Sequence, residues 1–238
     1  MTTHVVSPVE FDGGEIEITG QAYQHLFRAK RLRVGDELRV VDGEGRARRG
    51  VIGRVDRARG VVALAAAVPT REPAARIELW VAPPKPDRAA WLVEKATEIG
   101  AVAIRFVASE RAARESFGAH QILRLHRIAI AAVEQCGRSV VPEVSGVHPL
   151  DKRLAELEAA PRRAVALDVG APSGRLADAG EAGDAILLVG PEGGWSDDER
   201  HRFAAAGIAL AGLGERVLRV ETAAIVACAL ALLSSRTS

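Results

Sequence analysis

The sequence has few of the residues that build disulfide scaffolds or metal centres. Its 238 residues include two cysteines, Cys136 and Cys228, which are too few for a disulfide framework and too isolated for a zinc site. We expect both to be small buried apolar residues. The six histidines are scattered without metal-ligand spacing, so no metal cofactor is expected.

Long hydrophobic runs are also missing. The longest apolar stretch, residues 223–233, is shorter than the roughly 20 residues that a bilayer-spanning helix needs. The first residues, 1–4, lack the basic segment, apolar segment and cleavage site of a secretory signal. These absences predict a globular, cytoplasmic protein without a membrane anchor.

Positive and negative charges nearly balance over the whole chain, but they do not balance locally. The formal net charge is +1, yet residues 20–60 hold eleven Lys or Arg residues against five Asp or Glu residues. Within this stretch, four of the six residues at positions 28–33 are basic, namely Arg28, Lys30, Arg31 and Arg33. They can form a solvated basic face, but their concentration favours contact with nucleic-acid phosphates.

The chain divides into two patterns. Residues 5–68 contain short apolar or alternating runs separated by glycine turns, which predict a small β-domain in the form of a barrel. Residues 69–76 contain two prolines and no periodicity, which is typical of a linker. We therefore place the domain boundary between residues 72 and 73, giving domains 1–72 and 73–238.

Strand-like and helical patterns alternate in the second domain, which predicts a parallel α/β sheet. The expected strands are residues 77–81, 102–107, 164–167, 185–189 and 208–213. One helix is expected to begin with Asp87 as its cap and to end at Gly100. A second helix is expected over residues 119–136, with Gly137 ending it.

A glycine-rich turn, Gly190-Pro191-Glu192-Gly193-Gly194, follows the predicted strand 185–189 directly. Ser196 and Glu199 then fit a capping box that opens a helix over residues 197–206. The turn therefore lies at the carboxyl end of a parallel strand, where ligands bind in such sheets and where glycines allow close backbone approach. A plain strand-to-helix connection would give the same pattern.

The turn does not have the sequence of a phosphate-binding loop. It lacks the Gly-Lys-Ser/Thr of a Walker loop and the Gly-x-Gly-x-x-Gly of dinucleotide sites. Its carboxylate, Glu192, suits a ligand that carries positive charge. Trp195 adjoins the turn, and we expect both Trp195 and Trp91 to be core or loop anchors.

A second loop makes the pattern specific. Residues 213–223 read Leu-Gly-Glu-Arg-Val-Leu-Arg-Val-Glu-Thr-Ala and precede the apolar helix expected over residues 223–233. Together with residues 190–196, they resemble the signature of the bacterial 16S ribosomal RNA uridine-N3 methyltransferases of the SPOUT superfamily. Further matches are His25-Leu26, Arg31, Gly35-Asp36, Asp42-Gly43-Glu44-Gly45, Lys85-x-Asp87-Arg88, Glu94-Lys95-x-Thr97-Glu98-x-Gly100 and Glu134-Gln135-x-x-Arg138 with Pro142.

The resemblance covers nearly the whole chain and implies a fold: an N-terminal PUA-like β-barrel followed by a SPOUT α/β domain with a C-terminal trefoil knot. It also implies S-adenosylmethionine as the cofactor. The positions that match the family's cofactor loops are Leu167, Gly190, Glu192, Gly193, Leu213, Gly214, Val217 and Leu218. Leu167 and Leu218 could equally be core residues. Where the family usually opens with an arginine motif, this chain has His4-Val5-Val6.

The residues assigned to chemistry are Arg138, Glu192 and Arg219. Methylation at N3 requires loss of a proton, so a group that stabilises charge on the flanking carbonyl oxygens would assist it. The guanidinium of Arg138 can do this, although Arg138 can also be an exposed charge or pair with Glu134 one turn earlier. Arg219 and Glu221 can form a structural pair or lie near the substrate. No general base is assigned.

The resemblance further implies 16S ribosomal RNA in the small ribosomal subunit as the substrate and a homodimer as the active form. The residues expected to contact RNA are Arg28, Lys30, Arg31, Arg33, Arg111 and Arg138. Two other functions remain open: an RNA-binding assembly factor without turnover, and a SPOUT methyltransferase that acts on transfer RNA. The intact loops at residues 190–194 and 213–223 argue against the first, and the N-terminal matches argue against the second.

Overall fold

The computed structural model describes residues 1–112, 116–171 and 183–234. The chain forms two compact units, of which the first contains residues 1–72 and 130–141 and the second the remainder. The first unit therefore includes a segment, 130–141, that lies far along the sequence from the rest of it. Within the described ranges, no helix is long and apolar enough to cross a membrane.

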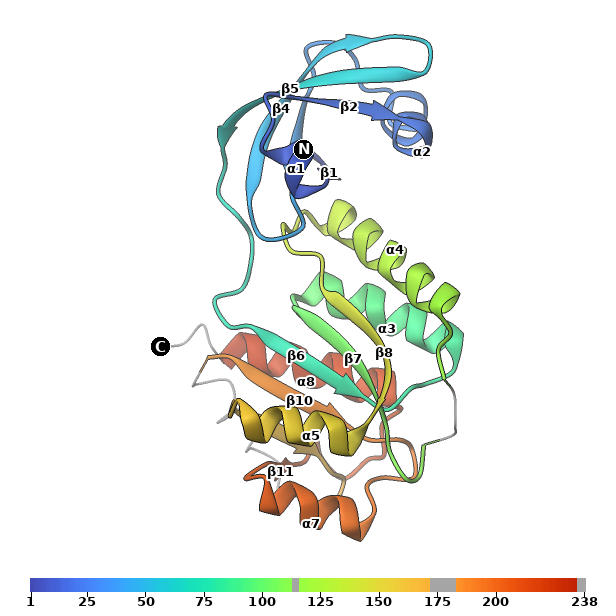
Figure 1. Cartoon of the computed structure of the whole chain (residues 1–238), viewed down its shortest axis with the longest axis vertical. Coiled ribbons are helices and arrows are strands. Elements are labelled where there is room, and N and C mark those ends of the chain that lie inside the picture. The colour runs from blue at the N-terminus through green and yellow to red at the C-terminus, as the bar shows by residue number, and fades with distance from the viewer. Residues whose placement is uncertain (113–115, 172–182, 235–238) are drawn as a thin grey trace. The chain divides into compact units, whose positions relative to one another are not determined.

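The first unit is built on a curled five-stranded sheet in the order β1-β3-β4-β5-β2 (Figure 1). β1 pairs with β3 in parallel, and the other pairs are antiparallel. Shifts of register between β4 and β5 interrupt the ladder, and such bulges increase twist and bend a sheet. The strands are β1 (Thr2–Val5), β2 (Glu15–Thr19), β3 (Glu37–Val41), β4 (Ala47–Val55) and β5 (Arg59–Ala67).

The core of the first unit follows from strand alternation. Ile16 and Ile18 of β2 are buried while their neighbours are exposed, as expected for a strand with one face on the core. The short helix α2 (Gly20–Tyr23) and the π-helical turn η1 (Gln24–Ala29) then contribute buried side chains to the same core. The predicted barrel is thus observed as a curled sheet with β1 and β2 at its edges.

The second unit contains a six-stranded sheet in the order β11-β9-β10-β6-β7-β8, and every pair is parallel. The strands are β6 (Ile77–Val81), β7 (Ala103–Ala108), β8 (Glu143–Pro149), β9 (Ala164–Leu167), β10 (Ala185–Val189) and β11 (Ala209–Ala211). The predicted alternation of strands and helices is confirmed, with β8 as an additional strand. All five residues of β10 are buried, as expected for a parallel strand covered on both faces.

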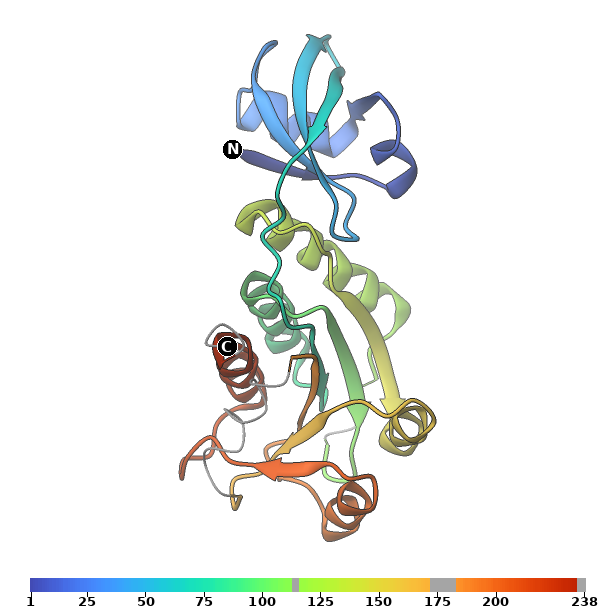
Figure 2. The ribbon, with the colours of Figure 1, turned by 90° about the vertical axis from the view of Figure 1, so that its left-hand side faces the viewer.

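Helices cover both faces of this sheet. In Figure 2, α3 and α8 lie on one side of the sheet, and α5 and α7 lie on the other. The side chains of α5 and α7 join Trp80, Ile186 and Leu188 in one core cluster. The helices are α3 (Pro86–Ile99), α4 (Ala119–Cys136), α5 (Leu150–Ala159), α7 (Asp197–Ala205) and α8 (Val220–Ser234).

Several local expectations need correction. Asp87 does not cap α3, because Lys85 is the N-cap residue and Pro86 takes the first helical position, which leaves Asp87 in the first turn. Cys228 is fully buried, but Cys136 is partly exposed. Trp91 is 43% exposed and is not a core residue. The helix ends at Gly100 and Gly137 are confirmed, and both glycines have positive φ values.

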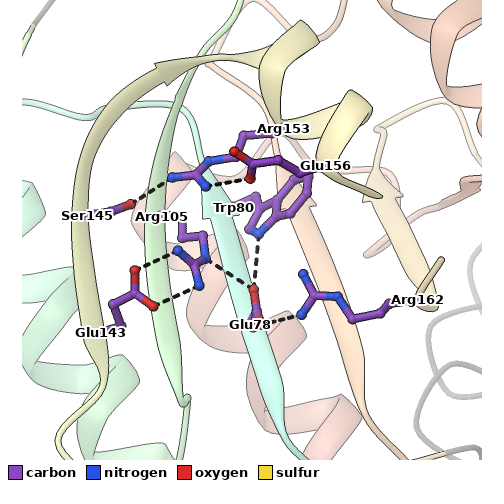
Figure 3. Close-up of polar contacts among 8 residues, drawn as sticks. All are labelled: Glu78, Trp80, Arg105, Glu143, Ser145, Arg153, Glu156 and Arg162. Atoms are coloured by element: carbon purple, nitrogen blue, oxygen red, sulfur yellow. Dashed lines mark hydrogen bonds and ion pairs between the residues drawn. The ribbon is translucent and has the colours of Figure 1, made fainter. Parts of the chain in front are cut away.

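An ionic network lies on the α5 side of the sheet, near the amino ends of the strands (Figure 3). Glu78 of β6 accepts hydrogen bonds from Arg162 and from Arg105 of β7, and Arg105 also donates two bonds to Glu143 of β8. Burial alone would raise the pKa of Glu78, but these arginines outweigh it and lower the pKa. The parallel register brings these distant residues together.

Candidate functional site

A cavity of about 370 Å³ lies at the carboxyl edge of the parallel sheet. Three loops form it: residues 167–170 after β9, residues 190–195 after β10, and residues 213–218 after β11. These strands are neighbours in the order β11-β9-β10, so their loops meet at one edge. Crevices at this edge are the usual ligand sites of open parallel sheets.

The eight residues expected to bind the cofactor all line this cavity. They are Leu167, Gly190, Glu192, Gly193, Leu213, Gly214, Val217 and Leu218. Leu167 is buried and at the same time forms part of the wall, whereas Val217 is 68% exposed. The loops at residues 190–195 and 213–218, which the sequence related only through the family signature, therefore lie around the same cavity.

Trp195 connects two of the loops. Its side chain is 1% exposed, and its indole nitrogen donates a 3.0 Å hydrogen bond to the carbonyl oxygen of Leu167. The ring also packs edge-to-face against Phe203, with 4.9 Å between ring centroids. A Cβ atom at Gly190 would lie 2.9 Å from the indole ring, so only glycine fits there. The prediction that Trp195 anchors this turn is confirmed.

The turn is fixed by the start of α7. Ser196 and Glu199 form the predicted capping box, which satisfies two backbone donors at the helix amino end. The buried carboxylate of Glu199 also accepts a 3.0 Å bond from the backbone nitrogen of Glu110, in the loop after β7. The loops after β7 and β10 are thus held to the same helix end.

Arg111 lies against the glycine-rich turn. A terminal nitrogen of its guanidinium donates to the carbonyl oxygens of Gly193 and Trp195, at 3.0 and 3.2 Å. These bonds brace the turn that lines the cavity. The expected contact of Arg111 with RNA stays a prediction, and its observed partners are backbone oxygens of the pocket.

Asp168 is a pocket residue that the sequence analysis did not identify. Its carboxylate accepts a 2.7 Å bond from Nε of Arg200, and this bond is the main cause of the raised pKa of Arg200. Asp168 also accepts a 3.1 Å bond from the backbone nitrogen of Gly170. Its place immediately after β9 is the sequence feature that could have identified it, because polar groups at strand carboxyl ends face this crevice.

Glu221 pairs with Arg88 at 2.7 Å, so the alternative in which Arg219 and Glu221 form a structural pair is wrong. The Glu221 side chain is buried, and its partner comes from the first turn of α3. Arg219 is exposed, and its carbonyl oxygen accepts the amide of Ala223 at the start of α8. A catalytic role for Arg219 or Glu192 stays a prediction.

Arg138 belongs to the first unit and is 4% exposed. Its guanidinium donates two hydrogen bonds to one carboxylate oxygen of Glu72, at 2.9 and 2.7 Å. The other oxygen of Glu72 accepts the amides of Ser139 and Val140. The alternative pairing with Glu134 is wrong, because Glu134 instead accepts bonds from His4 and from the amide of Val5.

The basic cluster expected to contact RNA lies on the surface of the first unit. Arg28, Lys30, Arg31 and Arg33 are all exposed. Arg28 stacks 5.6 Å from the centre of the Tyr23 ring and donates a 3.3 Å bond to the carbonyl of Arg57. The backbone of Arg31 has a φ of 59°, which is unusual for a residue other than glycine. The exposure of all four residues agrees with a solvated face and with phosphate contact, and the contact with RNA stays a prediction.

The comparisons with known proteins first give the class. The RNA methyltransferase domain family matches residues 70–232, and the RNA methyltransferase PUA domain family matches residues 18–62. The first match covers the unit that contains the cavity. The ribosomal RNA small subunit methyltransferase E of Mycobacterium tuberculosis is 34% identical, over 94% of this chain and 88% of that protein.

The chain belongs to the ribosomal RNA small subunit methyltransferase E family, which confirms the resemblance drawn from the two loops. The enzyme of this name from Neisseria gonorrhoeae, solved bound to S-adenosyl methionine, is 26% identical with a TM-score of 0.83, covering 96% of this chain and 95% of that one. A methyltransferase structure from Legionella pneumophila with bound SAM is 28% identical with a TM-score of 0.81, covering 98% and 96%.

Proposed function

We propose that this protein transfers the methyl group of S-adenosylmethionine to N3 of a uridine in 16S ribosomal RNA of the small ribosomal subunit. The observation that carries the proposal is the cavity at the carboxyl edge, which all eight residues expected to bind the cofactor line. Family membership supports the reaction, and the two relatives solved with this cofactor support the ligand.

The cavity suits S-adenosylmethionine in size and chemistry. Its volume of about 370 Å³ falls in the range of small-molecule pockets, roughly 300–1,000 Å³. Gly190 leaves room for the indole ring of Trp195 at the wall of the cavity, where any Cβ atom would lie 2.9 Å from that ring. The carboxylate of Glu192 on the lining favours a ligand with positive charge, which S-adenosylmethionine carries on its ammonium and sulfonium groups, whereas Asp168 is already paired with Arg200.

When bound, S-adenosylmethionine supplies a methyl group on a positively charged sulfur. The chain must then hold the uridine in line with that methyl group, and positioning alone can contribute roughly 7–11 kcal/mol in favourable cases. N3 must also lose its proton. The candidates for stabilising negative charge on the carbonyl oxygens beside N3 are Arg219, next to the cavity loop 213–218, and Arg138, whose guanidinium would first have to leave Glu72. Glu192 on the cavity lining is a further catalytic candidate.

We infer that the second unit is a SPOUT domain with a C-terminal trefoil knot. After β11 at the sheet edge, the chain returns so that α8 packs against α3, β6 and β10. On the way, residues 213–218 line the same cavity as the loops after β9 and β10. This return path supports a knotted end. With it we propose residues 1–72 as the RNA-binding domain and 73–238 as the methyl-transfer domain, of which residues 130–141 pack with the first unit.

A homodimer is part of the proposal. α3 and α8 pack against each other and carry the exposed apolar residues Trp91, Val226, Leu230 and Leu233. An apolar surface of this kind is typical of a protein interface. A cytoplasmic location is proposed with it, because the substrate is a ribosomal RNA.

The test is transfer of labelled methyl groups to small ribosomal subunits taken from a strain that lacks this protein, followed by nucleoside analysis. We expect label in N3-methyluridine of 16S ribosomal RNA. Label in another nucleoside would indicate a different SPOUT methyltransferase. Binding of S-adenosylmethionine without any transfer would indicate an assembly factor.

A further inference from the structure

The helix α4 has a basic side that the sequence analysis did not assign. Leu125, Ala129, Ala132 and Val133 are buried and form its packing side. On the other side, His120, Arg124 and Arg127 are exposed. Their spacings of four and three residues put them on one face of the helix, which we call the α4 basic face.

The two arginines of this face have no ion-pair partner among the residues that the structure describes. Glu134 is the only acidic residue in the sequence of α4, and its carboxylate is already bonded to His4 and to the amide of Val5. Like charges three or four residues apart on a helix destabilise it by about 0.2–0.5 kcal/mol. The free protein therefore gains no stability from placing Arg124 and Arg127 together.

Arginines elsewhere in the same unit are arranged differently. Figure 3 shows Arg105, Arg153 and Arg162 each bonded to a carboxylate, and Arg153 of α5 also donates to Ser145 of β8. These three arginines are each matched by an acid, and Arg111 is instead bonded to loop carbonyls. Within the described part of the chain, Arg124 and Arg127 have no such acid, which leaves their charge available to an anion outside it.

The position of α4 relates this face to the cavity. α4 follows β7, whose carboxyl end lies at the same sheet edge as the cavity, because all six strands are parallel. The loop after β7 is also fastened to the glycine-rich turn through Arg111. Residues 119–129, which include the whole α4 basic face, belong to the second unit together with the cavity.

We propose that the α4 basic face binds backbone phosphates of the RNA substrate. This inference rests on the proposed function and adds a contact surface in the methyl-transfer unit to the basic cluster at residues 28–33. Phosphate contacts orient an RNA without reading its sequence, and the guanidinium groups of Arg124 and Arg127 bind phosphate with paired donors. Such contacts would hold the RNA on the unit that contains the cofactor cavity.

The experiment compares the full-length protein with its Arg124→Gln, Arg127→Gln double variant. Glutamine keeps helix propensity and removes only the charge. Binding to a 16S ribosomal RNA transcript is measured between about 50 and 200 mM salt, where each lost phosphate contact changes the slope of log K against log salt by about 0.7–0.9. We expect the slope to fall by about 1.4–1.8 and the affinity for S-adenosylmethionine to stay unchanged.

Two further variants make the result specific. The Lys95→Gln, Lys152→Gln variant removes the same charge from α3 and α5, and we expect it to keep nearly the whole slope. The Arg124→Lys, Arg127→Lys variant restores the charge, and we expect it to restore the slope. The proposal would be overturned if the Arg124→Gln, Arg127→Gln variant had the same slope as the Lys95→Gln, Lys152→Gln variant. It would also be overturned if the Arg124→Lys, Arg127→Lys variant did not restore the wild-type slope.

The outcome is separable from the proposed function. If the wild-type protein transfers no methyl group to small subunits, the proposed function fails whatever the salt slopes are. If transfer occurs but the Arg124 and Arg127 variant binds the transcript with the wild-type slope, only the α4 basic face is overturned. The role of the α4 basic face in RNA binding would also be overturned if the Arg124→Gln, Arg127→Gln variant lost binding to an acidic protein partner but kept its binding to RNA.

Discussion

The two ends of the parallel sheet are built in opposite ways. At the carboxyl edge, glycines and backbone groups of three loops surround a cavity, and the side chains nearby, such as Trp195 and Arg111, bond to loop carbonyls. Near the amino edge, Arg105 and Arg162 each donate a hydrogen bond to the carboxylate of Glu78. The carboxyl edge surrounds its cavity with loop backbone, whereas near the amino edge a largely buried carboxylate is paired with two arginines of the chain.

The comparison predicts that substitutions will separate ligand binding from stability. The carboxyl edge should control affinity for S-adenosylmethionine with a small effect on unfolding. The network near the amino edge should control unfolding with no effect on affinity. The following substitutions test this separation, from the largest expected effect to the smallest.

Gly190→Val should have the largest effect. Its side chain would collide with the indole ring of Trp195, because even a Cβ atom would lie 2.9 Å away. We expect the affinity for S-adenosylmethionine to fall at least 100-fold, which corresponds to about 2.7 kcal/mol. Calorimetric titration checks this, and Gly14→Val is the matched control because no atom lies within 4 Å of a Cβ there. Wild-type affinity in Gly190→Val would contradict the account of the cavity.

Glu78→Gln should affect stability instead. It removes the charge that Arg105 and Arg162 share, and loss of one partner of a buried pair costs about 3–5 kcal/mol. We expect the free energy of unfolding, measured with urea, to fall by only about 2–3 kcal/mol, because Arg162 is half exposed and solvent screens its charge. Affinity for the cofactor should not change. Glu37→Gln, which breaks an exposed pair with Arg49, should leave the unfolding midpoint unaltered.

Trp195→Phe should have a smaller effect, again at the carboxyl edge. The substitution keeps an aromatic ring but replaces the indole with a smaller phenyl group, and the 3.0 Å bond to the Leu167 carbonyl is lost. We expect a decrease of roughly five- to tenfold in cofactor affinity, equivalent to about 1 kcal/mol. The control is Trp91→Phe, because Trp91 is 43% exposed on α3. Equal effects of the two substitutions would mean that Trp195 does not organise the cavity.

The pH dependence of unfolding should show the smallest effect. The pKa of Glu78 is lowered in the folded protein, so its contribution is complete above the unfolded pKa of about 4.3 and is lost as pH falls through the folded value. Stability of the wild type should therefore decrease below about pH 4.3, and less steeply in Glu78→Gln. Urea unfolding at pH 7, 5 and 3.5 measures how the free energy of unfolding changes with pH in the wild type and in Glu78→Gln. An identical change in the two proteins would exclude this role of Glu78.

The same comparison explains what the sequence could predict. The cavity was predictable because residues 190–194 and 213–218 carry local patterns, and the capping box of Ser196 and Glu199 is read directly from its spacing. The network was not predictable, because residues 78, 105 and 162 meet only when parallel strands align. A charged residue in a strand has no local mark that identifies its partner.

Other omissions have local causes. Strand β8 contains Gly146, His148 and Pro149, which interrupt the apolar alternation that marks a strand. The cap of α3 was misplaced because Pro86 fixes the first helical position and moves the start to Lys85. The partner of Arg138 was missed because Glu72 lies in the linker, where residues 68–76 form neither helix nor strand.

Calorimetric titration of the full-length protein with S-adenosylmethionine tests the central claim most directly. The cavity of about 370 Å³ at the carboxyl edge predicts saturable binding at one site per chain, lost in Gly190→Val and kept in Glu78→Gln. Absence of binding to the wild-type protein at millimolar concentrations of S-adenosylmethionine would contradict the account.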